Sequence, residues 1–425
     1  METIRISEGE GVIVGGPARI IVSTGIVDVF GRVCGAGDEL VVTYGKTYPL
    51  QALSHATLEL FRGSPSEYTR VSGRLIPEEW DTFVDLMTVG GRKVALILGD
   101  TDTGKSSLAL YAANKLCSKN YMTAVVDADI GQSDVGPPGV IGLCLVESPT
   151  LSLMDVPIAT GYFIGDKNPF GHFLAMVLGT KKMVDVAVKA GAEAILIDTT
   201  GLVRGGPASA LKAKKIEAVS PDIVASLQRG GEIEHLLAPL GDRYRILRLP
   251  VPTRMKGTGR KERIALRGFS MRKHVKGVQK LALDLDRIVL RETFLGTGVV
   301  KRELKAELST LLGCDVVHVE EAPDALIALV KGAYALSSLE KLRKNYDKEV
   351  KIARTGGLER LMLGLLDEDE GLRDVGFLES IDFNTRQLIV STSLQDKEAV
   401  KYVKFGYLRV DSEGTEVGRR MVGTI

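Results

Sequence analysis

The chain has 425 residues, more than one ordinary hydrophobic core accommodates, so two or three domains are expected. Hydrophobic residues make up 44% and the formal net charge is +1, which is typical of a globular protein and argues against a surface that is basic throughout. The four cysteines form no CxxC pair, which excludes a zinc knuckle. The opening METIRISEGEG has no apolar core, and no apolar run approaches the ~20 residues of a membrane span. We expect no signal peptide, no membrane contact and a cytoplasmic location.

The N-terminal part of the chain, residues 1–73, has the pattern of short β-strands. GVIVGGPARIIVSTGIVDVFGRV alternates β-branched residues with Gly and Pro turn signals, and ELVVTYGKTYPL and TLELFRG continue it. Such close spacing predicts a small β-sandwich or barrel. The segment carries no catalytic motif, so we interpret it as a scaffold or docking module.

Residues 74–290 alternate between helical and apolar strand patterns. PEEWDTFVDLM predicts a helix with acids in its first turn, and an apolar strand at residues 94–98 leads into a glycine-rich loop and the helical KSSLALYAANKL. The later strands are TAVVDAD, AEAILIDTTG and DIVASL. Buried strands alternating with helices predict an α/β domain with a doubly wound parallel sheet.

The remainder, residues 291–425, is expected to form a C-terminal α/β domain. KRELKAELSTLLG has a helical pattern, and DALIALV and RQLIVSTSL have strand patterns.

The segment GDTDTGKSS follows the strand at residues 94–98 and matches the P-loop pattern in full. In such a loop the backbone N–H groups hold the β-phosphate, Lys105 adds positive charge, and the Ser106 hydroxyl can ligate a divalent cation. We therefore predict a site for ATP or GTP together with Mg²⁺ or another divalent cation. The expected nucleotide-binding residues are Gly99, Asp100, Thr101, Asp102, Thr103, Gly104, Lys105, Ser106 and Ser107.

Carboxylates follow two further strands, at the edge of the sheet where ligands bind in such folds. VVDADIGQSDVGPPG places Asp127 and Asp129 after one strand, and ILIDTTG places Asp198 and Thr199 after another. One carboxylate can assist the metal and another can accept a proton from an attacking hydroxyl. Either Asp127 or Asp198 could take the metal, and the sequence leaves that choice open.

Four motifs occur in a characteristic order: GDTDTGKSS, DADIGQSDVGPPG, GYFIGDKNPFGH and ILIDTTGLVRG. On these motifs the chain resembles the RNA 5'-hydroxyl polynucleotide kinases, a family that includes the kinase-like subunit of the mRNA 3'-end cleavage factor and the pre-rRNA-processing kinase. With neither an insertion nor an acidic tail, it looks like the compact archaeal form. The resemblance implies an N-terminal β-domain, a central P-loop kinase domain and a C-terminal α/β domain. It implies transfer of a γ-phosphate to the 5'-hydroxyl end of single-stranded RNA, with DNA as a further acceptor, in tRNA or other RNA end-processing.

The resemblance also implies roles for individual residues. Asp129 matches the proposed general base, and NPFGH falls where the family has an RNA-gripping clasp that usually reads Thr-Pro-x-x-Asn. Leu202 stands where many eukaryotic members have a tryptophan that stacks on a base, which implies weaker or differently placed recognition. The implied substrate-binding residues are Gln132, Asn168, Pro169, His172, Thr199, Leu202 and Arg254.

Positive charge is concentrated between residues 241 and 280. In the family, a basic lid closes over the nucleotide there, and its arginines are implied to stabilise charge on the transferring phosphoryl group. Arg260, just before ERIALR, and Arg263, at its start, fit this lid by their position, and Arg254 is a third candidate.

Two other functions compete with the kinase. A catalytically weak ATP-binding subunit could organise an RNA-processing complex, although the intact Lys105, Ser106 and Asp129 argue against it. A GTPase switch would need an N-K-x-D motif, and DKNP at residues 166–169 is not one. The sequence does not indicate protein partners.

Overall fold

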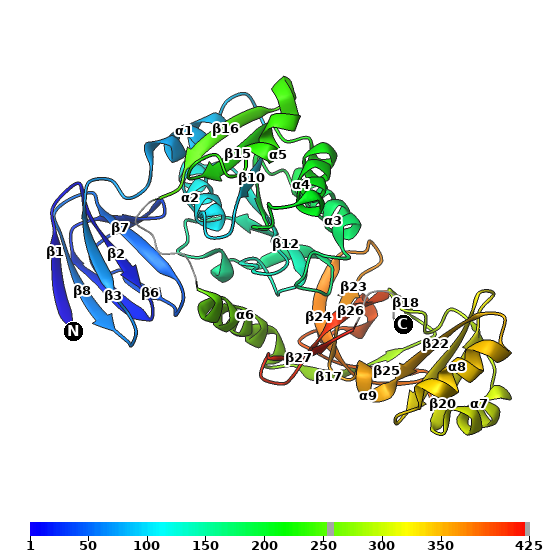
Figure 1. The fold of residues 1–425 in the computed structure, drawn as a ribbon. Helices are drawn as coiled ribbons and strands as arrows, with labels where there is room; N and C mark the ends of the chain where they lie inside the picture. The colour runs from blue at the N-terminus through cyan, green and yellow to red at the C-terminus, as the bar shows by residue number, and fades with distance from the viewer. Residues whose placement is uncertain (253–258, 421–425) are drawn as a thin grey trace. The chain divides into compact units, whose positions relative to one another are not determined.

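The computed structural model describes residues 1–252 and 259–420 (Figure 1). By internal contacts the chain divides into two compact units. The first comprises Met1–Ile164 and Asn168–Ser270, and the second comprises Gly165–Lys167 and Met271–Ile425. Division of the chain into domains at residues 73 and 290 stays a prediction. No helix in the described ranges combines the length and apolar character needed to cross a membrane.

The first unit begins with two antiparallel sheets, as the β-rich pattern of residues 1–73 predicts. Alternate residues of their strands point into a shared core, in which Ile4, Ile20 and Leu58 are fully buried. One sheet has the order β1 (Glu2–Ile6), β8 (Ala56–Arg62), β3 (Ala18–Thr24), β6 (Glu39–Val42). The other has the order β5 (Arg32–Cys34), β4 (Val27–Val29), β7 (Thr47–Ala52), β2 (Glu10–Gly15), β9 (Tyr68–Ser72).

A seven-stranded sheet forms the centre of the first unit. Its order is β13 (Ile158–Phe163), β12 (Val140–Val146), β11 (Thr123–Ala128), β14 (Ala194–Thr199), β10 (Lys93–Gly99), β15 (Ile223–Gln228), β16 (Arg245–Pro250). From β11 to β16 the strands are parallel, which confirms the predicted α/β fold. β12 and β13 instead pair antiparallel at one edge, because a loop without a crossover helix joins β11 to β12.

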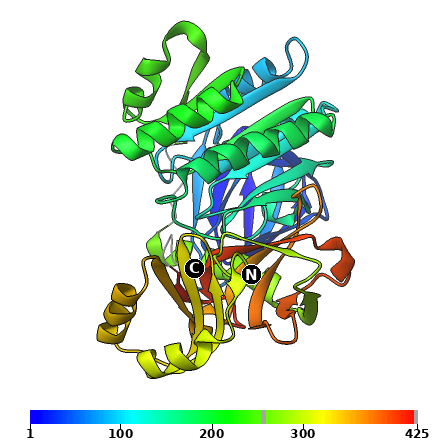
Figure 2. The ribbon, with the colours of Figure 1, turned by 90° about the vertical axis from the view of Figure 1, so that its right-hand side faces the viewer.

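Helices cover both faces of this sheet (Figures 1 and 2). Successive β10 residues alternate between two cores: Ala95 and Ile97 lie in the core that holds α2 and the N-terminal sheets, and Leu96 and Leu98 lie under α3 and α4. The N-terminal sheets therefore share a continuous core with one face of the central sheet. The helices are α1 (Glu78–Met87), α2 (Lys105–Ser118), η1 (Leu153–Asp155), α3 (Phe173–Lys189), α4 (Gly206–Val219), α5 (Glu234–Leu237), η2 (Ala238–Arg243) and α6 (Arg260–Val275).

The second unit contains two further sheets and its own cores. One sheet has the order β17 (Gln279–Asp284), β25 (Gln387–Thr392), β24 (Leu372–Asp382), β23 (Leu361–Leu366), β26 (Tyr402–Val410), β18 (Val289–Arg291), with β27 (Glu416–Arg419) beside β26. The other has the order β19 (Val299–Val300), β20 (Asp315–Glu321), β21 (Ala325–Lys331), β22 (Glu349–Arg354). Its helices are α7 (Leu304–Leu312), α8 (Leu336–Asn345), α9 (Thr355–Leu358) and η3 (Lys397–Ala399). Strands and helices here agree with the α/β character expected from the sequence.

Candidate functional site

The phosphate loop occupies the turn between β10 and α2, as the motif predicts. At Gly99 a Cβ atom would lie 2.3 Å from Thr103 Oγ1, so the turn accepts only glycine without rearrangement. Gly104 has a φ of +91°, in the left-handed region that glycine adopts without strain. No side chain caps the first turn of α2, which begins at Lys105. Its N–H groups are therefore available to an anion.

Positively charged side chains surround the loop. Lys105 is buried and donates to the backbone oxygen of Asp100 at 2.8 Å. Arg263 of α6 pairs with the Asp102 carboxylate at 2.9 Å, so the structure brings this predicted lid arginine to the phosphate loop. The remaining lid candidates cannot be placed in the same way, since Arg254 lies outside the described residues and so does the side chain of Arg260.

Two arginines that the sequence analysis missed also hold the loop. Arg204 pairs with Asp100 at 3.0 Å, and Arg229 donates to the backbone oxygen of Asp102 at 2.8 Å. The only sequence signal for them was the presence of two acids within a loop that binds anions. Such acids need cationic partners if phosphate is to approach.

Ser106 and Asp198 meet across the end of the sheet. Ser106 Oγ donates to Asp198 Oδ2 at 2.5 Å, and the buried Asp198 Oδ1 has no hydrogen-bond partner among the described residues. Burial raises the pKa of Asp198 to about 6, although Lys105 and the Ser106 hydrogen bond act in the opposite direction. A hydroxyl beside an unpartnered carboxylate oxygen is the type of ligand set that hard divalent cations prefer.

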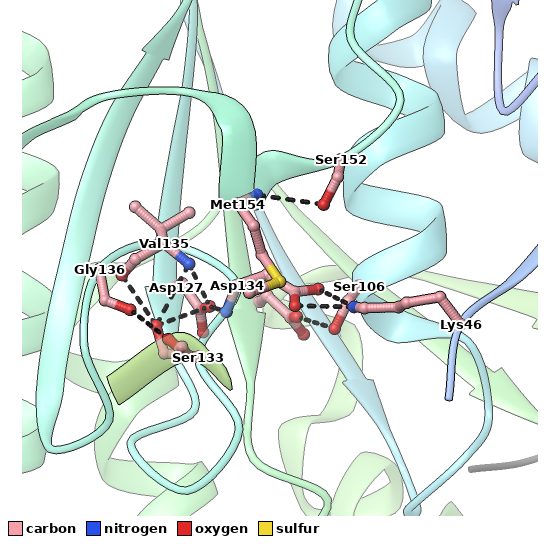
Figure 3. A network of polar contacts seen from close by, with 11 residues as sticks. Lys46, Ser106, Asp127, Ser133, Asp134, Val135, Gly136, Ser152 and Met154 are labelled. Carbon is pink, nitrogen blue, oxygen red and sulfur yellow. Dashed lines mark hydrogen bonds and ion pairs between the residues drawn. The ribbon is translucent and has the colours of Figure 1, made fainter. Parts of the chain in front are cut away.

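The Asp127 carboxylate instead accepts hydrogen bonds from the loop that follows its strand (Figure 3). Its Oδ1 accepts from the N–H of Asp129 at 3.0 Å. Its Oδ2 accepts from the Ser133 hydroxyl at 3.1 Å and from the N–H groups of Asp134 and Val135 at 2.6 and 3.2 Å. This buried carboxylate therefore organises the loop over residues 129–135.

Asp129 lies on the exposed side of that loop. Its Oδ1 accepts from the N–H groups of Gly131 and Gln132 at 3.0 and 3.2 Å, and no described residue donates to Oδ2. These two bonds orient the carboxylate while leaving one oxygen available. Gln132 Nε2 is buried close by, with no hydrogen-bond partner in the described part of the chain.

A cavity of about 450 Å³ within the first unit lies between the phosphate loop and Asp129. Residues 101–107, Asp129, Gln132 and Arg263 line it, together with Gly201. From α6, Leu266, Arg267 and Ser270 also contribute to the wall.

The N-terminal sheets also line the cavity, which the sequence analysis did not foresee. Phe30 and residues 45–48 form part of its wall. Lys46 pairs with Asp134 at 2.8 Å, so this segment is tied to the loop that carries Asp129 (Figure 3). No motif in residues 1–73 signals this contribution, because it depends on how the sheets pack against α2.

Several other residues predicted for the site, Asp127 and Asp198 among them, do not line this cavity. Thr199 is buried and donates to the backbone oxygen of Ile97 at 2.7 Å. Leu202 packs against the core beneath α3 and α4. Of the clasp residues Asn168, Pro169 and His172, the last is buried at the start of α3, and Asn168 Oδ1 accepts from the N–H of Phe170 at 3.1 Å.

The sheet, the loop and the Ser106–Asp198 pair define a P-loop nucleotide-binding protein. Residues 99–277 match the family described as mRNA cleavage and polyadenylation factor CLP1 P-loop. A polyribonucleotide 5'-hydroxyl-kinase of Pyrococcus abyssi is 33% identical over 325 residues, which cover 76% of this chain and 89% of the relative. A polyribonucleotide 5'-hydroxyl-kinase of Methanocaldococcus jannaschii is 30% identical over 328 residues, which cover 76% of this chain and 88% of the relative. The chain belongs to this family of P-loop kinases.

A solved structure agrees with this assignment at the level of the fold. A chain of the Clp1p–Pcf11p complex superimposes with a TM-score of 0.65 at 12% sequence identity. The alignment covers 96% of this chain and 97% of that one, so the likeness extends through both compact units.

Proposed function

We propose that this protein is a polynucleotide 5'-hydroxyl kinase that transfers the γ-phosphate of ATP to the 5'-hydroxyl end of RNA. The observation that carries the proposal is that the phosphate loop and Asp129 line one and the same cavity. A phosphate donor and an alcohol acceptor could meet there. Membership of the family supports the choice of RNA as acceptor.

The donor is proposed to lie with its phosphates on the loop at residues 99–107. Lys105, now bonded to the backbone of Asp100, would turn to the β- and γ-phosphates. Phe30, Leu110 and Val251 give the cavity an apolar part that suits the face of a nucleobase. We propose ATP as the donor, with GTP as the alternative. Competition between the two nucleotides in the transfer assay would distinguish them.

Ser106 and Asp198 would hold Mg²⁺. They fit this ion because Asp198 Oδ1 is a buried carboxylate oxygen without a partner, next to a hydroxyl. Asp127 fits less well, since both of its oxygens already accept hydrogen bonds from the 129–135 loop. When bound, the cation would neutralise charge on the phosphates.

Asp129 is proposed as the general base. Its carboxylate would take the proton of the RNA 5'-hydroxyl as that oxygen forms its bond to the γ-phosphorus, and the bond from that phosphorus to the β-phosphate oxygen would break to release ADP. Gly131 and Gln132 hold the carboxylate through Oδ1. The Gln132 side-chain amide could donate to the acceptor strand.

Arg263 is proposed to face the transferring phosphate once nucleotide displaces it from Asp102. Participation of Arg254 and Arg260 stays a prediction. So does RNA gripping by Asn168, Pro169 and His172, which would act outside the cavity described here, and base contact by Leu202. For Thr199 we infer a role in the fold, because its hydroxyl is already bonded to β10.

The test is label transfer from γ-labelled ATP, with Mg²⁺, to a 5'-hydroxyl oligoribonucleotide. The same RNA carrying a 5'-phosphate is the matched control, and a DNA strand of the same sequence tests acceptor choice. Label should appear only on the 5'-hydroxyl strand and should vanish with Lys105→Ala, while Lys119→Ala at the exposed end of α2 should leave it unchanged. ATP binding without transfer to any end would instead favour an ATP-binding subunit of an RNA-processing complex.

A further inference from the structure

Two lysines of α4 are buried beneath the nucleotide site. Lys212 and Lys215 are each 1% exposed, and no carboxylate in the described part of the chain lies within ion-pair distance of either ammonium group. Burial therefore holds the pKa of Lys212 well below its ordinary value. Burial of an amine without a paired anion is costly, because its charged form loses its hydration. Packing alone therefore does not account for lysine at these two positions.

The contacts of Lys212 point to the loop that follows β14. Its Nζ donates to Thr199 Oγ1 at 2.9 Å and to the backbone oxygen and Oγ1 of Thr200 at 2.5 and 3.2 Å. Thr199 in turn donates to the backbone oxygen of Ile97. One ammonium group thus fixes both residues that follow Asp198. Lys215 has a single, longer contact, 3.4 Å to the backbone oxygen of Ala128.

The loop held by Lys212 rests directly on the phosphate loop. A Cβ atom on Gly201 would lie 2.6 Å from Thr101 Oγ1 and 2.9 Å from the Thr101 backbone nitrogen. Gly201 also lines the cavity. A shift of residues 199–201 would therefore move the cavity wall beside the phosphate loop.

We propose that Lys212 is a positioning residue for phosphoryl transfer, which holds residues 199–201 against the phosphate loop so that the distal phosphate meets the acceptor in line. This rests on the proposed kinase function for the reaction it serves. Its contribution is geometric: a misplacement of about 1 Å can lower a rate by roughly 10²-fold without weakening binding.

The test compares Lys212→Met with Lys214→Met. Lys214 lies on the same helix, but its side chain is 66% exposed and pairs with Glu217, so its replacement should be neutral. In Lys212→Met we expect only a small change in Tm, because removal of the buried amine offsets the hydrogen bonds lost at Thr199 and Thr200. We expect nucleotide affinity within about threefold of the parent and kcat lower by about 10²-fold. Hydrogen exchange of the amides at residues 199–202 should become faster. An unchanged kcat with unchanged exchange would overturn the proposal, as would a loss confined to Tm.

A second variant perturbs the same contact without touching α4. In Gly201→Ala the added methyl group would push the loop away from Thr101. We expect it to lower kcat as Lys212→Met does, and the double variant should lose little more, because both changes disrupt one contact. If the losses in log kcat of the two single variants add fully in the double variant, the two changes do not act through one contact. If Lys212→Met fails to fold, Gly201→Ala still decides whether the position of this loop controls the rate.

Failure of the kinase proposal would look different. If the parent protein transfers no phosphate to any RNA or DNA end, two measurements still test the positioning role. These are the preference between ADP and an ATP analogue, and the rate of amide hydrogen exchange at residues 199–202. Lys212→Met should then bind ADP as the parent does but lose part of any preference for a non-hydrolysable ATP analogue, because on this proposal only the third phosphate would reach the displaced wall. Equal preference in both proteins would reject the positioning role independently of catalysis.

Discussion

Ser106 Oγ donates to Asp198 Oδ2 at 2.5 Å, although the two residues are 92 positions apart in the sequence. Asp127 ends the neighbouring strand in register with Asp198, yet its oxygens are bonded to the following loop. Two carboxylates at equivalent positions thus have different surroundings. One has an oxygen available to a cation, and the other is part of the backbone framework.

Replacement of these two carboxylates should separate metal binding from stability. Asp198→Asn should weaken the apparent affinity for Mg²⁺ by about 10–100-fold with little loss of Tm. Asp127→Asn should instead lower the free energy of unfolding by about 2 kcal/mol, since an amide nitrogen would face at least one N–H or O–H donor. Mg²⁺ titration of the kinase rate and thermal unfolding of both variants measure this. The reverse pattern would assign the metal to Asp127.

Asp129→Asn should abolish proton acceptance but preserve the loop, because an amide oxygen can still accept from Gly131 and Gln132. We expect kcat to fall by about 10²–10⁴-fold while ATP affinity is retained. Asp185→Asn on the exposed surface of α3 is the matched control. A variant that keeps its rate would show that another group takes the proton.

Arg263 and Asp102 form an ion pair in which the side chains are 27% and 30% exposed. Arg263→Ala should lower kcat by about 10³-fold or more if the guanidinium stabilises the transferring phosphate. Asp102→Asn releases the arginine and should leave kcat at or above that of the parent. Steady-state kinetics of the two variants check this. If both lower kcat equally, the ion pair itself and not the arginine alone would be required.

Lys215 makes stability depend on pH in the alkaline range. Burial lowers its pKa from 10.5 to about 8, although Asp129 and Asp127 act in the opposite direction. The unfolded chain therefore binds more protons between these two values, and the free energy of unfolding rises with pH across that window. Lys215→Met should be more stable than the parent at pH 7, by on the order of 3 kcal/mol, and most of the difference should be lost by pH 10.5.

Urea unfolding from pH 7 to pH 10.5 measures this difference, with Lys214→Met as the exposed control. A difference that does not change with pH would mean that Lys215 is not the group that titrates.

Much of the site was predictable from local sequence. The phosphate loop between β10 and α2 depends on contiguous residues, because glycines at fixed spacing and the first turn of a helix suffice to form an anion site. The alternation of apolar strands and helices likewise predicted the central sheet, because each of these patterns lies within one contiguous segment. The antiparallel β12–β13 edge was not predicted, since the pattern of buried strands does not reveal strand direction.

The sequence by itself determined the class of site, a phosphate loop with carboxylates after neighbouring strands. Only the tertiary structure decided how these groups are used: which aspartate has an oxygen to offer, that Arg263 reaches Asp102 over 161 positions, and that Phe30 and Lys46 line the cavity. The physical reason is that hydrogen bonding and burial depend on which segments meet in space. Segments far apart in the chain leave no signal in the spacing of residues.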